Sequence, residues 1–310
     1  MPSFMRSAAA GGAGAGTRAG LHGQTLVSTG HADLDRVLGG GLPLGALLVI
    51  LEDTASPHAA TLLRCFAAEG VACGHQVLWA AGGQVPPGGL ADVLPAFARV
   101  RGADKEAEAP KQATAPEEAQ LRIAWQYRPR RWCHEFDLTR PMADETLRGA
   151  HADSAYFAGA AAVQELGTAV LRAAFRIKGV LRASRCAGML SFPAGLYPPD
   201  VAVRLAHLAD GVLDVQALRD DSGLTRLATD PASCCGLLHM RKLPGLGAFA
   251  RPTPEAPLLL LRHRRTRLAI EEVQIDPDAE AAEAAASGAR PAAAGLCGGG
   301  PPGAASALDF

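Results

Sequence analysis

The turn that follows residues 46–51 is where this sequence could carry phosphate chemistry. Residues 46–51 (ALLVIL) predict a buried strand, and residues 56–70 predict a helix with Pro57 near its start and Gly70 at its end. A turn between such elements holds phosphate when it reads GxxxxGK followed by Ser or Thr, because its backbone N–H groups and its lysine neutralise the anion. Residues 52–61 contain neither glycine nor lysine. The polar residues of this degenerate phosphate-loop position are Glu52, Asp53, Thr54, Ser56, His58 and Thr61.

The charge in this turn opposes anion binding. Glu52 and Asp53 stand where phosphate oxygens would lie, and like charges repel. His58 could act as a weak cationic substitute, but an ordinary histidine at the start of a helix is the simpler interpretation. We therefore predict no catalytic residue, no cofactor and no metal in this chain.

A first basic cluster lies beside aromatic residues. Arg128, Arg130 and Arg131 follow Trp125 and Tyr127. A basic loop of this kind can grip an RNA backbone and stack a base on an aromatic ring. A solvated loop next to core aromatics is the alternative interpretation. The three arginines are therefore candidate contacts for RNA.

A second basic cluster, residues 262–267 (RHRRTR), is the densest in the chain. In a continuous strand, alternation would place Arg262 and Arg264 on one face, where both could contact RNA. An edge strand protected by charge explains the cluster equally well. His239 and Arg241 form a further pair on a predicted strand that could face a subunit boundary, with a half-buried structural histidine as the alternative.

Composition limits the class of protein. The chain has 310 residues, of which 48% are hydrophobic and 20% charged, with a net charge of −1, so binding to RNA or membrane would need a local patch. Its seven cysteines are odd in number and form no CxxC pair, which argues against a disulfide framework or a zinc site and favours the cytosol or nucleus. No apolar run approaches the length of a membrane helix.

The elements that would position these residues predict an α/β protein. We expect a disordered tail over residues 1–20, a single domain over 21–275 with a flexible insertion at about 102–118, and a second tail over 276–310. A strand at 77–80 completes a strand–helix–strand unit, which predicts a parallel sheet. Later residues predict helices at 169–184 and 198–209, strands at 186–192 and 211–215, and an antiparallel hairpin from 236–242 and 258–270. Asp210 and Asp214 are interpreted as surface carboxylates.

Residues 28–53 (STGHADLDRVLGGGLPLGALLVILED) resemble the signature of RecA-like and KaiC-like domains. Gly39, Gly40 and Gly41 allow the chain to turn where a β-carbon would clash, and Leu34 and Leu38 face one side of a short helix. The resemblance implies a RecA-like, mainly parallel sheet flanked by helices, with a late antiparallel hairpin.

Further blocks of the chain follow one pattern in order. They are GTR at 16–18, LVSTG at 26–30, GGGL at 39–42, ED at 52–53, AEG at 68–70, GH at 74–75, RIAWQY at 122–127, FDL at 136–138, RPM at 140–142, GLLHMRKLPGL at 236–246 and LDF at 308–310. These blocks resemble the Elongator complex protein 4 family over nearly the whole chain. The resemblance implies a non-catalytic subunit in a hexameric ring with Elongator subunits five and six, docked on the catalytic core. The ring would bind tRNA while another subunit makes the carboxymethyl-type modification of the wobble uridine, in cytoplasm and nucleus. The candidate RNA contacts for this role are Arg128, Arg130, Arg131, Arg262 and Arg264.

One region departs from the family pattern. Only residues 143–187 separate the RPM block from the later strand, and they favour alanine-rich helix, so the central strand of the sheet is expected to be missing or degraded. Two other functions stay open. One is a RecA-like or KaiC-like ATPase acting on nucleic acid, to which Arg241 could lend a charge at a subunit boundary. The other is a scaffold that touches no RNA.

Overall fold

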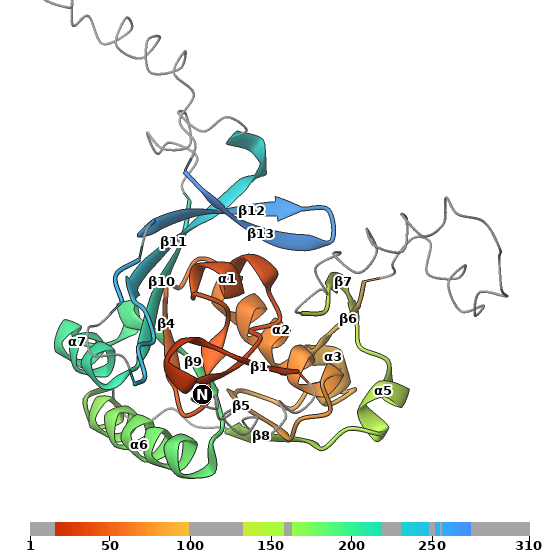
Figure 1. The fold of residues 1–310 in the computed structure, drawn as a ribbon, viewed down its shortest axis with the longest axis horizontal. Helices are drawn as coiled ribbons and strands as arrows, with labels where there is room; N and C mark the ends of the chain where they lie inside the picture. The colour runs from red at the N-terminus through yellow and green to blue at the C-terminus, as the bar shows by residue number, and fades with distance from the viewer. Residues whose placement is uncertain are drawn as a thin grey trace, which may run out of the picture.

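A six-stranded mixed sheet forms the centre of the protein (Figure 1). The computed structural model describes residues 16–98, 133–157, 163–218, 231–247, 252–254 and 256–273. The strand order is β13-β12-β11-β10-β4-β9, in which β9–β4 and β4–β10 are parallel and the other pairs are antiparallel. The bounds are β4 (Leu47–Glu52), β9 (Gly188–Pro193), β10 (Gly211–Ala217), β11 (Cys234–Lys242), β12 (Leu258–Arg264) and β13 (Arg267–Glu272).

The predicted α/β class and the late antiparallel hairpin are confirmed, but a mainly parallel sheet is not. The antiparallel part is larger than expected because residues 258–270 do not form one strand. They form β12 and the start of β13, joined by a turn at Arg265 and Thr266. The predicted single strand with alternating arginines is therefore wrong.

Helices cover both faces of the sheet, which explains the continuous apolar run in β4. On one face, Leu48 and Ile50 pack with Leu34 and Leu62 from the helices α1 and α2. On the other, the alternate residues of β4 pack against α6 and α7. Figure 1 shows these helix pairs on opposite sides of the sheet. The bounds are α1 (Ala32–Val37), α2 (His58–Ala72), α6 (Val163–Ser184) and α7 (Pro199–Leu208).

The predicted strand at 77–80 lies outside the central sheet. It forms β5 (Val77–Gly82), which pairs in parallel with β8 (Ala152–Phe157) in a separate two-stranded sheet. Half-buried and exposed residues alternate along β5, so it is not the fully buried strand that was expected. Residues 143–187 are mostly helical, as expected, because α5 (Asp144–Arg148) and α6 (Val163–Ser184) make up most of their described part. The strand described in this region, β8, pairs with β5 and does not join the central sheet.

The remaining elements pack on the side of α2 that faces away from the central sheet. There, buried Cys65 and Val71 contact Leu94, Phe136 and Met142. These elements are α3 (Leu90–Val93), β6 (Pro95–Phe97), β7 (Phe136–Pro141) and α5 (Asp144–Arg148), and a small sheet of β1 (Thr17–Ala19), β2 (Thr25–Val27) and β3 (Leu42–Pro43) lies near the start of the chain. Single-turn 3₁₀ helices are η1 (Leu21–Gly23), η3 (Ala194–Leu196) and η4 (Pro231–Ser233).

The sequence motif at 28–53 builds a hydrogen-bonded turn. The buried Asp35 carboxylate accepts hydrogen bonds from Ser28 Oγ at 2.5 Å, Thr29 N at 2.7 Å and Thr29 Oγ1 at 2.7 Å. Gly40 and Gly41 have φ angles of 120° and 125°, which only glycine adopts readily. The motif therefore fixes the approach of the chain to β4 through hydrogen bonds within the chain.

The predicted tails fall largely outside the described residues, as does the insertion at 102–118, while β1 lies within residues 1–20. Among the helices that the structure describes, none has the length and apolarity that crossing a membrane requires.

Candidate functional site

The turn after β4 is held together by the carboxylate of Asp53. Its Oδ1 accepts hydrogen bonds from Ser56 N at 3.0 Å and Ser56 Oγ at 2.8 Å, and its Oδ2 accepts one from Ala217 N on β10. Burial opposes ionisation, but the hydrogen bonds from Ala217 and Ser56 together lower the pKa of Asp53. The turn therefore contains the negative charge of Asp53. This carboxylate accepts hydrogen bonds from backbone N–H groups of the kind that a phosphate loop donates to its ligand.

The other polar residues of the turn do not supply a positive charge to it. Burial and the neighbouring Asp53 charge raise the pKa of Glu52. His58 is buried, and its Nε2 lies 3.0 Å from the carbonyl oxygen of Cys235 on β11, away from the turn. Thr61 Oγ1 donates to the carbonyl oxygen of Pro57 at 3.0 Å, and Thr54 is exposed. His58 is thus an ordinary structural histidine at the start of α2, as the simpler interpretation of the sequence predicted.

A cleft of about 1220 Å³ opens at the carboxyl ends of β4 and β10. Residues of both charge signs line it, including Glu52, Asp53, Asp214, Arg241 and Lys242. The Arg241 guanidinium is ion-paired with the Asp214 carboxylate, and the Lys242 amine donates to the carbonyl oxygens of Ala206, His207 and Ala209. Both cations at this end of β11 are therefore engaged within the chain. His239, two residues before Arg241 on the same strand, is exposed.

Asp210 and Asp214 are not surface carboxylates, because both are buried. Asp210 lies 2.9 Å from Lys178 Nζ and 2.9 Å from Arg182 on α6, and it accepts a hydrogen bond from Leu47 N at 3.0 Å. Burial opposes its ionisation, but these partners lower the pKa of Asp210. The prediction failed because the partner cations come from a helix about 30 residues earlier in the chain.

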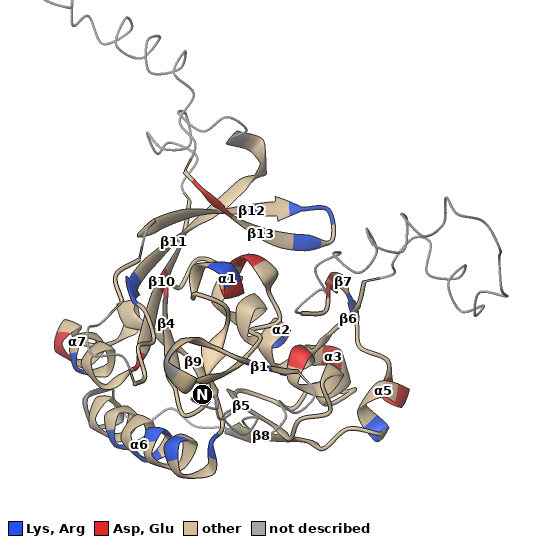
Figure 2. Ribbon diagram, in the orientation of Figure 1, with Lys and Arg blue, Asp and Glu red and all other residues tan. Residues whose placement is uncertain are grey.

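The turn between β12 and β13 presents an exposed basic surface (Figure 2). Its members, His263, Arg264, Arg265 and Arg267, are all exposed, and we call them the basic turn. Arg264 pairs with Glu271 at 2.8 Å, and Arg267 approaches Glu135 at 4.0 Å.

Arg262 does not belong to the basic turn, because its side chain is buried. It is 5% exposed, its Nε lies 3.1 Å from Glu271 Oε2, and its Nη1 donates to Ser233 Oγ at 2.9 Å. Of the two arginines predicted to contact tRNA here, only Arg264 is on the surface. The sequence missed Arg265 and Arg267 as candidates because it did not predict the turn.

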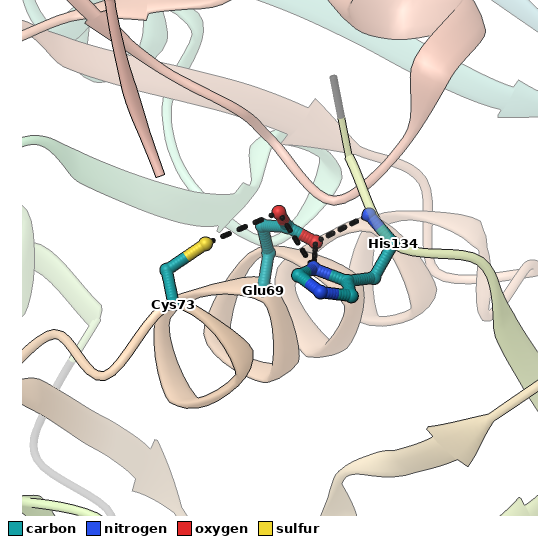
Figure 3. A group of neighbouring side chains, drawn as sticks. All are labelled: Glu69, Cys73 and His134. Carbon is teal, nitrogen blue, oxygen red and sulfur yellow. Dashed lines mark hydrogen bonds and ion pairs between the residues drawn. The ribbon is translucent and has the colours of Figure 1, made fainter. Parts of the chain in front are cut away.

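Three potential metal ligands meet beside α2 (Figure 3). Glu69 and Cys73 are four residues apart on one face of the helix, and His134 reaches them from the segment that leads into β7. Their ligand atoms all lie within 4.8 Å of one another. Burial and the nearby Glu69 carboxylate raise the pKa of the Cys73 thiol to about 12. The sequence analysis missed this group, although the Glu69–Cys73 spacing was a signal for it.

Comparison with known proteins identifies the family. The profile of the family described as PAXNEB protein matches residues 12–174 and 160–295. The chain belongs to the PAXNEB family. Zebrafish Elongator complex protein 4 is 25% identical over 340 residues, which cover 85% of each protein. The mouse protein of that name is 27% identical, covering 89% of this chain and 85% of its own. A Xenopus laevis protein of that name is 35% identical over 44% of this chain and 37% of its own length.

The alignment with the zebrafish protein contains gaps on the side of this PAXNEB chain. The alignment with the zebrafish protein runs over 340 residues, more than the 310 residues of the chain, so the relative contains segments that this chain lacks. The two matched parts of the family profile meet at residues 160–174, inside the region 143–187. Of the residues predicted to contact tRNA in this PAXNEB protein, Arg128, Arg130 and Arg131 lie outside the described part of the chain.

Proposed function

We propose that this PAXNEB protein is a non-catalytic subunit of an Elongator complex, in the cytoplasm and nucleus. The observation that carries the proposal is the match to relatives named Elongator complex protein 4 over most of the chain. The turn after β4 supports a non-catalytic role, because the Asp53 carboxylate already accepts hydrogen bonds from the backbone N–H groups of Ser56 and Ala217. A subunit of this kind would contribute binding surface while another subunit performs the chemistry.

We further propose that residues 21–275 form one RecA-like domain. Parallel strands β9, β4 and β10 between two helix pairs, followed by antiparallel strands, support this class. A single domain is supported by α2, which packs on the central sheet through Leu62 and on the outer elements through Cys65. RecA-like domains offer different faces to their neighbours, so subunits of this class can close into rings. A hexameric ring shared with Elongator subunits five and six follows from this proposal.

The assembled ring would bind tRNA and support carboxymethyl-type modification of its wobble uridine. With a net charge of −1 the chain has no general attraction for RNA, so a local basic surface must supply it. The basic turn is the first candidate for this RNA-binding surface, because its residues are exposed. The cluster at Arg128, Arg130 and Arg131 is the second candidate.

The test is tRNA binding by a ring reconstituted from the full chain and subunits five and six. Replacing Arg264 and Arg265 with alanine should weaken tRNA binding about tenfold and reduce the steepness of its salt dependence by up to about two units, since up to two fewer phosphates are neutralised. Arg176→Ala, an exposed arginine on α6, is the matched control. Rings that form normally and bind tRNA equally well with the double variant would remove the basic turn as a contact.

A second candidate function is a nucleotide-dependent ATPase, which the cleft at the ends of β4 and β10 favours. Arg241 and Lys242 line that cleft, but both are engaged by groups of the chain itself. Saturable ATP binding in this cleft, abolished by Arg241→Ala, would support the alternative. A pure scaffold would instead assemble the ring and leave tRNA affinity unchanged when all the candidate arginines are replaced.

A further inference from the structure

Glu69, Cys73 and His134 combine the chemical groups that zinc prefers. Zinc in proteins is bound by thiolate sulfur, imidazole nitrogen and carboxylate oxygen, usually in a tetrahedron. Glu69 and Cys73 are fixed relative to each other because Glu69 lies in the last turn of α2 and Cys73 is its C-cap, whose N–H donates to the Glu69 carbonyl oxygen at 2.9 Å. His134 comes from another part of the chain and points its ring toward them (Figure 3).

The distances between the ligand atoms suit a tetrahedral ion. Bond lengths of about 2.0 Å to nitrogen or oxygen and about 2.3 Å to sulfur place tetrahedral ligands roughly 3.3–3.6 Å apart. Cys73 Sγ lies 3.4 Å from Glu69 Oε1, and His134 Nδ1 lies 3.2 Å from the same oxygen. Small side-chain shifts would therefore admit a zinc ion between the three atoms.

A backbone hydrogen bond holds the carboxylate in place for this role. His134 N donates to Glu69 Oε2 at 3.0 Å, which fixes one carboxylate oxygen and leaves Oε1 directed toward Cys73. The His134 Nδ1 atom lies 3.2 Å from both carboxylate oxygens. Hydrogen bonds of this kind orient ligands and strengthen metal binding. The Glu69 side chain is 3% exposed, so a charge on it needs a close counter-charge.

The charges of such a site would balance. A zinc ion with two positive charges would meet one carboxylate, one thiolate and a neutral imidazole, which leaves a half-buried site without net charge. The His134 side chain is 48% exposed, so ions have a path from solvent and a water molecule can take the fourth position. Magnesium and calcium prefer sites made of oxygen atoms alone.

We propose that Glu69, Cys73 and His134 form a zinc site that joins α2 to the segment leading into β7. The ion would replace the hydrogen bonds among the three side chains and clamp two parts of the chain that are 61 residues apart between Cys73 and His134. Its contribution would be to stability, because the group lies on the outer side of α2, away from the cleft at the ends of β4 and β10.

The experiment measures zinc binding to the full chain under reducing conditions by competition with a chromogenic chelator. We expect one zinc ion per chain and a higher melting temperature with zinc than with the chelator or with magnesium. Cys73→Ser and His134→Ala should each lower zinc affinity at least about 100-fold, because each removes a direct ligand. Cobalt in place of zinc should give a thiolate-to-metal charge-transfer absorption that Cys73→Ser abolishes.

The control variants replace a cysteine and a histidine that lie outside the proposed zinc site. Cys186→Ser and His263→Ala alter an exposed cysteine and an exposed histidine outside the site, and both should bind zinc like the unaltered chain. His134→Ala changes a half-exposed side chain, so it tests the site even if Cys73→Ser fails to fold. The proposal is overturned if the folded chain binds no zinc in the micromolar range, or if His134→Ala binds it with unchanged affinity.

Discussion

At the scale of single residues, Asp53 decides what the turn after β4 can do. In a phosphate loop the backbone N–H groups are free to meet an anion from solution. Here the carboxylate of Asp53 accepts hydrogen bonds from Ser56 and Ala217, so the turn contains its own anion. The negative charge at this position is a stabilising part of the fold and at the same time an obstacle to nucleotide binding.

This role predicts a pH-dependent effect of Asp53→Asn. The folded-state pKa of Asp53 lies below its ordinary value, so its ionised form stabilises the fold above the unfolded pKa of about 3.9 and this contribution is lost as pH falls through the folded value. We expect the variant to lower the free energy of unfolding by about 1 kcal/mol at pH 7.

Urea denaturation at a series of pH values measures this effect. The difference between Asp53→Asn and the unaltered chain should shrink below about pH 4, where the carboxylate begins to protonate in the unfolded chain. Asp153→Asn, at an exposed position on β8, is the control and should change stability little. A difference that stays constant down to pH 2 would contradict a role for the Asp53 charge.

At the scale of elements, Arg262 and Arg265 show that one basic run places its arginines in two different environments. Arg262 is buried in β12 with Glu271 and Ser233 as partners, while Arg265 is exposed in the turn. Arg262→Ala should lower the free energy of unfolding by about 1–2 kcal/mol, because it removes a buried guanidinium with its bond to Ser233, while Glu271 keeps Arg264 as a partner.

The matched variant is Arg265→Ala, which should unfold at the same urea concentration as the unaltered chain. Both variants are measured by urea denaturation of the full chain. Equal stability of the two variants would show that the ion pair of Arg262 with Glu271 contributes little to the hairpin.

Most elements could be predicted from local patterns, because their signals lie within the segments themselves. Pro57 at the start and Gly70 near the end located α2 to within two residues, and the apolar runs located β4 and β9. Pairing could not be predicted in this way. Nothing within residues 77–80 says that β5 joins β8 rather than the central sheet, since this depends on a partner more than 70 residues later.

The candidate sites also divide into those that local sequence predicts and those that depend on residues far apart in the chain. The degenerate turn at 52–61 was predictable because glycine and lysine are local requirements of a phosphate loop. The ion pairs of Asp210 and Arg241 and the meeting of Glu69 with His134 depend on the tertiary fold. The basic turn was missed because Arg265 and Thr266 carry no glycine or proline to mark a turn.

At the scale of the whole molecule, the proposed role is that of a subunit that acts through assembly. The chain lacks a phosphate loop of the usual composition, its central sheet is covered by helices on both faces, and its relatives are named as parts of a complex. The shortened region 143–187 still forms α5, β8 and α6 within its described residues. We therefore expect this shorter chain to remain competent for assembly.

The most direct test is affinity purification of the tagged full chain from its own cells, with mass spectrometry of the proteins that accompany it. The account predicts recovery of the other Elongator subunits, with subunits five and six in amounts comparable to the chain. Arg265→Ala should recover the same set, because the basic turn is proposed to contact tRNA rather than protein. A soluble, folded chain that recovers no Elongator subunit would contradict the proposed function and leave only the α/β fold and the family standing.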